Sequence, residues 1–175
     1  MDFTSNYFEI FGLPVSYQID LALLANRYHD MQKEFHPDRY AGKPAQEQRL
    51  AVQYASVINQ AYSDLKSPLC RAQYLLSLKG LDISGETHIT HDPLFLMRQI
   101  ELREALSDLR EAEEPFVELE AVAQDASSQY VELQETFDRQ YHQADFDNAI
   151  ETVAKMQFFS KLLKEAEQLE QELDN

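Results

Sequence analysis

The sequence predicts an all-α fold, in which a helical hairpin is followed by an antiparallel three-helix bundle. Only 4 of the 175 residues are glycine, and leucine, alanine, glutamine and glutamate are abundant, as is typical of helical proteins. Apolar residues recur at alternating spacings of three and four along several segments, which is the period of one helix face. Six prolines separate these segments.

The first half of the chain contains a short apolar segment at 5–11 and two longer amphipathic segments. One helix is expected to begin after Asp20, an N-cap residue, and to run to residue 35, while a second should follow Pro44. Their apolar stripes are Leu21, Leu24, Tyr28, Met31 and Phe35 in the first, and Ala51, Tyr54, Ile58, Ala61 and Leu65 in the second. Two such helices joined by a short loop should pack antiparallel.

The second half predicts a connecting helix, a linker and a bundle. Ser67 and Pro68 are suited to the start of a short helix that Gly80 would end. We therefore expect one unit at 1–75, with the connecting helix reaching about residue 80, and a short linker at 81–91. A three-helix domain at 92–175 should follow, with helices at about 93–112, 115–142 and 146–173.

The two halves differ in charge. Residues 1–75 contain 7 Lys/Arg and 8 Asp/Glu, whereas residues 76–175 contain 8 and 23, so the net charge of −16 lies mostly in the second half. Such asymmetry suggests two units with different partners. The acidic balance argues against nucleic-acid binding, because contacts to phosphates need a basic surface.

The sequence shows neither a targeting peptide nor a membrane segment. Its first twenty residues contain no Lys or Arg, and no apolar run approaches the ~20 residues that span a bilayer. The single cysteine, Cys70, excludes an intramolecular disulfide framework. We expect a cytoplasmic protein with no membrane partner and no cofactor.

A candidate recognition motif, FHPDRY, occupies residues 35–40. Proline cannot continue a helix, so His36-Pro37-Asp38 could be no more than a helix stop. Its position between two helices, however, places it at the exposed tip of the expected hairpin. Loop tips contribute little to a core and often carry recognition residues.

Residues 7–66 resemble the J-domain family, on YFEIFGLP (7–14), HPD (36–38) and INQAYSDLKSP (58–68). The resemblance implies that this unit docks on a DnaK-type chaperone and stimulates its ATPase. His36, Pro37 and Asp38 would contact the nucleotide-binding domain and linker of the chaperone, beside positive charge from Arg27, Lys33 and Arg39. The phosphate-binding pattern GxxxxGK[ST] is absent from the sequence, so we expect a regulator with no catalytic residues rather than an enzyme.

The expected helix at 93–112 carries two apolar faces. Phe95, Leu102, Leu106 and Leu109 fall on one side as a core stripe. The opposite side carries Leu96, Met97, Ile100, Glu101, Glu104 and Asp108. An apolar patch rimmed by carboxylates predicts a protein-binding surface, with coverage by the first half of the chain as the alternative.

Three segments resemble the J-domain co-chaperones of iron–sulfur cluster biogenesis, and the similarity runs nearly end to end. The segments are SPLCRAQYLLSLKG (67–80), HDPLFLMRQIELREAL (91–106) and VAKMQFFSKLLKEAEQLE (153–170). The resemblance implies that the bundle binds the scaffold protein IscU and that the J-domain recruits the chaperone HscA. The implied scaffold-binding residues are Leu96, Met97, Ile100, Glu101, Glu104, Asp108 and Phe158.

Two details qualify this resemblance. Some related proteins carry an amino-terminal cysteine-rich metal site, but no cysteine precedes Cys70 here, so we predict no such zinc module. Phe158 and Phe159 are neighbours about 100° apart on a helix, so we expect that both cannot lie at the centre of one stripe.

Two other classes of function remain open. The first is a metalloenzyme that uses the five histidines at 29, 36, 88, 91 and 142, although no carboxylate–histidine pair repeats along the bundle as a di-iron site requires. The second is a general J-domain adaptor that serves other client proteins through the acidic bundle.

Overall fold

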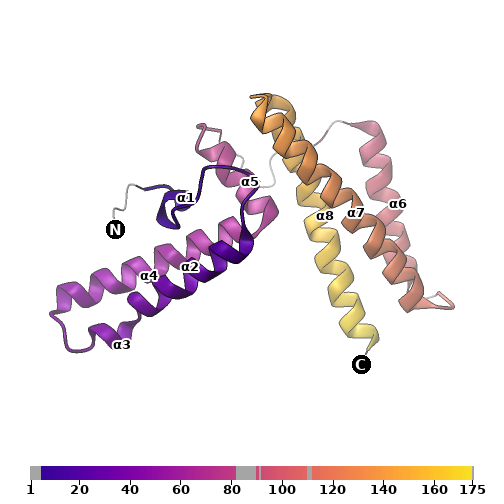
Figure 1. The fold of residues 1–175 in the computed structure, drawn as a ribbon. Coiled ribbons are helices and arrows are strands. Elements are labelled where there is room, and N and C mark those ends of the chain that lie inside the picture. Colours follow the sequence, from indigo (N-terminus) through magenta and orange to yellow (C-terminus); the bar gives the residue numbers. More distant parts are fainter. Residues whose placement is uncertain (1–4, 82–89, 91, 110–111, 175) are drawn as a thin grey trace. The chain divides into compact units, whose positions relative to one another are not determined.

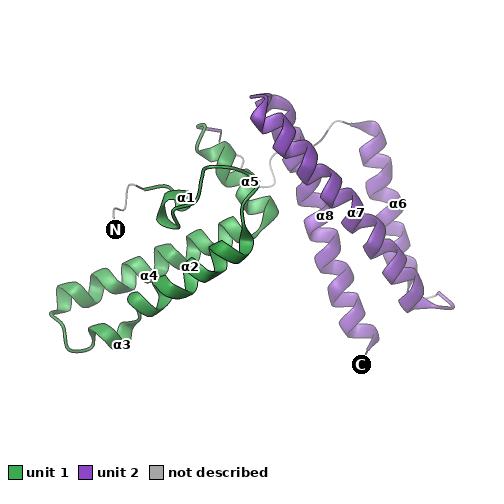
Figure 2. Cartoon of the chain, in the orientation of Figure 1, with its two compact units in different colours: residues 1–80 green, residues 81–175 purple. Residues whose placement is uncertain are grey.

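The computed structural model describes residues 5–81, 90, 92–109 and 112–174 of the protein. Every regular element within these residues is a helix, which confirms the all-α prediction. The chain forms two compact units, residues 1–80 and 81–175 (Figure 2). Apart from residues 81 and 90, the expected linker at 81–91 lies outside the described residues.

The first unit contains five helices, and its centre is the predicted hairpin. They are α1 (Tyr7–Ile10), α2 (Leu21–Glu34), α3 (Pro37–Tyr40), α4 (Ala45–Lys66) and α5 (Pro68–Ser77). Figure 1 shows α2 and α4 side by side, with α3 at the end where the chain turns back. Asp20 caps α2 as expected, because its side chain accepts a 2.9 Å hydrogen bond from the Leu23 N–H.

The predicted stripe of α4 provides much of the core of this unit, whereas the stripe of α2 buries only Leu24 and leaves Leu21 49% exposed. The buried apolar side chains are Phe8, Phe11, Leu13, Tyr17, Leu24, Ala51, Ile58, Ala61, Leu65, Ala72, Leu75 and Leu76. Half-buried aromatic pairs extend the contact along the hairpin, since Tyr28 stacks on Tyr62 with 3.9 Å between ring centroids. Phe35 at the end of α2 lies 5.2 Å from Tyr54 of α4, again between centroids. The core thus reaches close to the tip.

The connecting helix α5 packs within the first unit. The Tyr74 ring stacks on Tyr7 of α1 at 4.2 Å, and its hydroxyl accepts a 2.9 Å hydrogen bond from the Tyr7 N–H. Buried Arg71 donates to the Leu65 carbonyl at 2.8 Å and lies over the Tyr17 ring. The helix ends at Ser77, three residues before the expected stop at Gly80. Two further turns follow it, in which the N–H groups of Lys79 and Gly80 donate to the carbonyls of Leu76 and Ser77, and Gly80 has φ +78°.

The second unit is the predicted three-helix bundle of α6 (Pro93–Asp108), α7 (Pro115–His142) and α8 (Phe146–Leu173). The bounds of α7 and α8 match the prediction, whereas α6 ends four residues before the expected 112. None of the described helices combines the length and apolar character needed to cross a membrane.

The bundle core buries both members of the Phe158–Phe159 pair. Both can be buried although they point about 100° apart, because α8 contacts both α6 and α7 and therefore buries more than one stripe. The core cluster comprises Phe95, Leu102, Leu106, Leu109, Leu119, Ala126, Phe158, Phe159, Leu162 and Ala166.

Candidate functional site

The His36-Pro37-Asp38 segment forms a structured corner rather than the simple loop expected from the sequence. His36 has extended backbone angles and caps the single-turn helix α3, in which Pro37 is the first residue. Proline suits this position because its fixed φ is helical and its missing N–H is not needed there. The Asp38 N–H donates a hydrogen bond to the Nδ1 atom of His36, with 3.3 Å between the two nitrogens. The corner therefore orients the imidazole from within the motif.

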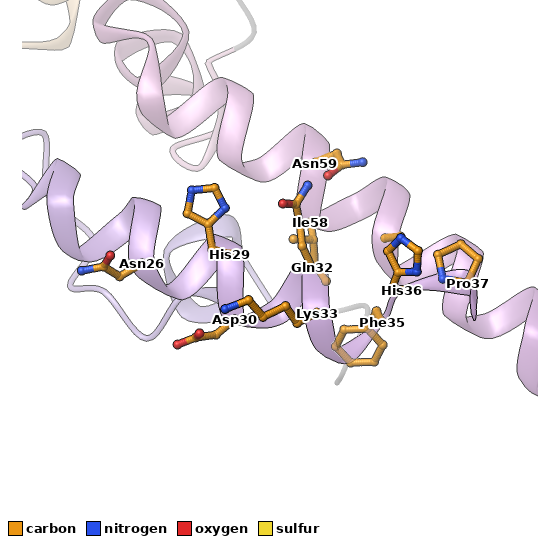
Figure 3. Close-up of a pocket in the computed structure, with 11 residues that line it drawn as sticks. Asn26, His29, Asp30, Gln32, Lys33, Phe35, His36, Pro37, Ile58 and Asn59 are labelled. Carbon is orange, nitrogen blue, oxygen red and sulfur yellow. The ribbon is translucent and has the colours of Figure 1, made fainter. Parts of the chain in front are cut away.

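The side chains of this corner are exposed. The exposed fractions are 58% for the His36 side chain and 90% for the Asp38 side chain, and Pro37 is also exposed. His36 and Pro37 line one end of an open groove of about 870 Å³ between α2 and α4. Figure 3 shows His29 and Lys33 of α2 and Asn59 of α4 along the same groove. A partner can reach the motif without any rearrangement of the hairpin core.

Two of the three predicted cations lie close to the motif. Lys33 is exposed and lines the groove with His36. Arg39 is exposed and donates a 3.3 Å hydrogen bond to the Lys33 carbonyl, so its guanidinium folds back onto the end of α2. Both side chains therefore place positive charge beside His36.

Arg27 has a different environment. It precedes His36 by nine residues, roughly 13 Å along a helix axis. Its Nη1 atom donates to the carbonyl of Phe11 and, at 2.6 Å, to that of Gly12. Gly12 has φ +58°, and a Cβ there would meet Arg27 Nη1 at 2.7 Å. Arg27 thus holds the connection between α1 and α2, which sequence periodicity could not show.

We expect Arg27→Ala to lower the stability of the first unit by roughly 1–3 kcal/mol, as is usual for hydrogen bonds to charged groups. Lys33→Ala is the matched control, because it removes an exposed cation of the same helix and should change the melting temperature little. Thermal unfolding followed by circular dichroism measures both. Equal melting temperatures for the two variants would show that the Arg27 contacts contribute nothing.

The α6 helix presents the predicted exposed face. Leu96, Met97 and Ile100 are 39%, 60% and 57% exposed, while all four members of the opposite stripe are buried. The carboxylates Glu101, Glu104 and Asp108 are exposed on the same side as the apolar residues. The structure thus confirms the division of this helix into a core face and an exposed face.

Phe158 does not share this exposure. Only 8% of its surface is accessible, and its ring meets Phe95 edge-on with 5.7 Å between centroids. The Arg103 guanidinium lies over the Phe158 ring at 5.7 Å. The structure therefore places this predicted site residue in the bundle core, beneath a cation of α6.

Polar contacts at the start of α6 attach it to α8, and sequence analysis missed them. Asp92 caps α6 by accepting from the N–H groups of Leu94 and Phe95 at 3.1 and 3.3 Å. The same carboxylate pairs with Lys155 of α8 at 2.7 Å, and the Lys155 ammonium lies over the Phe95 ring. The hydrogen bond from Lys155 is the main cause that lowers the pKa of Asp92. Lys155 lies 63 residues from Asp92, so local sequence patterns gave no signal of this pair.

Arg98 makes a second polar attachment, midway along α6. Its guanidinium pairs with Glu101 on the same helix at 2.9 Å and with Asp125 of α7. The hydrogen bond to Glu101 is the first cause that raises the pKa of Arg98. One of the predicted interface carboxylates is therefore already paired within the bundle.

The Asp92–Lys155 pair predicts a pH effect. Because the pKa of Asp92 is lower in the folded protein than the ordinary value of 3.8, the pair stabilises the fold above that value. This contribution is lost as the pH falls through the folded-state pKa. We expect Asp92→Asn to lower the melting temperature at pH 7. The melting temperatures of the variant and the wild type should converge as the pH falls below about 4. A constant difference from pH 7 to pH 2.5 would contradict this assignment.

The described residues contain no group of three or more His, Cys, Asp or Glu side chains placed to hold a metal ion. Two of the histidines considered for a metalloenzyme, His88 and His91, lie outside the described residues. Among the described residues, the predicted recognition features that are exposed are the corner at His36 and the outer face of α6.

Comparisons with known proteins agree with both units. Residues 91–167 match the family model described as the HSCB C-terminal oligomerisation domain. The co-chaperone protein HscB of Proteus mirabilis is 42% identical over 172 residues, which cover 96% of this chain and 97% of the relative. Among solved structures, chaperone HscB from Vibrio cholerae has a TM-score of 0.86 at 37% identity, covering 97% of this chain and 99% of that one. Human co-chaperone HscB has a TM-score of 0.89 at 28% identity, covering 97% and 84%. The chain therefore belongs to the HscB family of J-domain co-chaperones.

Proposed function

We propose that the protein stimulates the ATPase of the DnaK-type chaperone HscA and delivers the iron–sulfur scaffold protein IscU to it, so that it assists cluster transfer. The observation that carries the proposal is the presence of two exposed recognition features on two separately folded units. One is the His36-Pro37-Asp38 corner, and the other is the apolar and acidic outer face of α6.

In this proposal the first unit acts on the chaperone by binding. His36, Pro37 and Asp38 contact its nucleotide-binding domain and linker, with Lys33 and Arg39 supplying positive charge at the same end of the hairpin. The corner is already ordered by its own hydrogen bonds, so little side-chain freedom is lost on docking. Stimulation then follows if the corner binds one conformational state of the chaperone more tightly than the other. Arg27 supports this surface from the middle of α2, where it holds the connection between α1 and α2.

The second unit provides the scaffold-binding face. The apolar side chains are Leu96, Met97 and Ile100, and the carboxylates are Glu101, Glu104 and Asp108. Exposed apolar groups give an interface its binding energy when they are desolvated, while exposed acidic groups beside them steer a basic partner. Phe158 contributes from beneath the face, by supporting α6 through Phe95 and Arg103.

The proposal is tested by measuring ATP turnover by HscA with IscU alone, with this protein alone and with both. We expect the rate with both to exceed the sum of the two separate stimulations, since delivery places the scaffold and the J-domain on one chaperone. A general J-domain adaptor would give a different result. IscU would leave its stimulation of HscA unchanged, and it would bind varied unfolded polypeptides.

A further inference from the structure

The exposed face of α6 extends toward its N-terminus beyond the scaffold-binding positions proposed above. Leu94 is 78% exposed, the largest fraction among the exposed large apolar side chains of the described residues. It precedes Met97 by three positions, so the two side chains are neighbours on the helix surface. With Leu96 and Ile100, they place four exposed large apolar side chains within seven residues. Scattered exposed leucines are ordinary, whereas a contiguous group marks an interaction site.

The position of Leu94 is fixed before any partner binds. Its N–H donates to Asp92 at 3.1 Å, and the Asp92 carboxylate is held in turn by Lys155 of α8. Leu94 therefore lies in the first turn of a capped helix whose start is attached to the bundle. A side chain presented from ordered backbone loses less freedom on binding than one on a mobile segment.

The face is also polarised along the helix. Its large apolar side chains lie within residues 94–100, and its carboxylates are Glu101, Glu104 and Asp108. A rise of about 1.5 Å per residue separates Met97 from Glu104 by roughly 10 Å along the axis. The apolar side chains thus occupy the N-terminal part of the face and the carboxylates its C-terminal part, so the carboxylates do not surround the apolar group.

We infer that Leu94 is a further scaffold-contacting residue and anchors the apolar end of this face. The scaffold surface that fits this face is an apolar cluster with basic groups on one side only. These basic groups lie roughly 10 Å from the apolar cluster, in the direction of the C-terminal end of α6. The inference rests on the proposed scaffold binding, because it names an additional residue and an orientation for that same surface.

Binding kinetics of the full chain with purified IscU, at several salt concentrations, test the inference. We expect Leu94→Ala to raise Kd about fivefold or more through faster dissociation, with the salt dependence of association unchanged. Glu104→Gln should slow association and reduce its salt dependence. Val131→Ala is the matched control, because it truncates an exposed apolar side chain of α7 and should change neither rate.

Three results would overturn the inference. In the first, alanines at Leu96, Met97 and Ile100 abolish binding but Leu94→Ala dissociates at the wild-type rate. Leu94 would then lie outside the contact, and the proposed function would stand. Equal changes in salt dependence for the Leu94 and Glu104 variants would refute the polarity. If the Leu94 variant and the variant with alanine at Leu96, Met97 and Ile100 both bind as the wild type does, this face does not bind the scaffold.

Discussion

His36→Gln is expected to remove the stimulation of chaperone ATPase almost completely, by at least tenfold, while the protein keeps its stability. The His36 side chain is 58% exposed, so its replacement removes little buried packing. Exposed substitutions of this kind usually change stability by no more than about 0.5 kcal/mol. Single-turnover ATP hydrolysis by HscA measures the activity, and thermal unfolding measures the stability.

The control for this variant is His142→Gln, which removes an exposed imidazole at the end of α7 in the second unit. It should stimulate the chaperone as the wild type does, and both variants should bind the scaffold normally. A large fall in melting temperature for His36→Gln would show that the residue is structural. Full stimulation by the same variant would remove the corner from the mechanism.

Replacing Leu96, Met97 and Ile100 together by alanine is expected to weaken scaffold binding by about a hundredfold. Each exposed apolar side chain at the centre of an interface contributes on the order of 1 kcal/mol or more when truncated, and 1.4 kcal/mol is tenfold in Kd. The fold should survive, because the three side chains are exposed and alanine is a strong helix former. Stimulation of HscA in the absence of the scaffold should be unchanged.

Leu102→Ala provides the contrast within the same helix. Leu102 is buried in the bundle core, so its truncation should cost about 2–5 kcal/mol of stability through the cavity that it leaves. Melting temperature and scaffold affinity should be measured on the same samples. If the triple variant unfolds as Leu102→Ala does, the outer face of α6 has been misassigned.

Local sequence patterns predicted most of the helices. The starts of α7 and α8 were predicted correctly from Pro115 and from the acidic residues around Phe146, because a proline at the first helical position and an acidic residue in the first turn act locally. The C-terminal end of α6 was predicted too late, since apolar spacing continues to Leu109 while the helix itself stops at Asp108. The turn of helix at Pro37 was missed because a single turn leaves no periodicity.

The candidate site was predictable only where exposure follows helical periodicity. Periodicity placed Leu96 and Met97 on the outer face, and the structure agrees. It could not show that Arg27 binds the carbonyls of the preceding loop, or that Phe158 lies under Arg103. Those contacts join segments distant in sequence, so they depend on tertiary packing that no local pattern records.

The attachment of α5 to α1 determines where the J-domain can be separated from the rest of the chain. A fragment that stopped at Lys66 would lose the Tyr74 ring that covers Tyr7 and the Arg71 side chain that binds the Leu65 carbonyl. It would also leave Phe8 and Leu65 partly open to water, at about 25 cal/mol for each Å² of apolar surface uncovered. A fragment through Gly80 keeps these contacts. In this protein the segment that follows α4 is therefore part of the first folding unit. A fragment without it would lose chaperone stimulation because the unit folds poorly, although its recognition residues are intact.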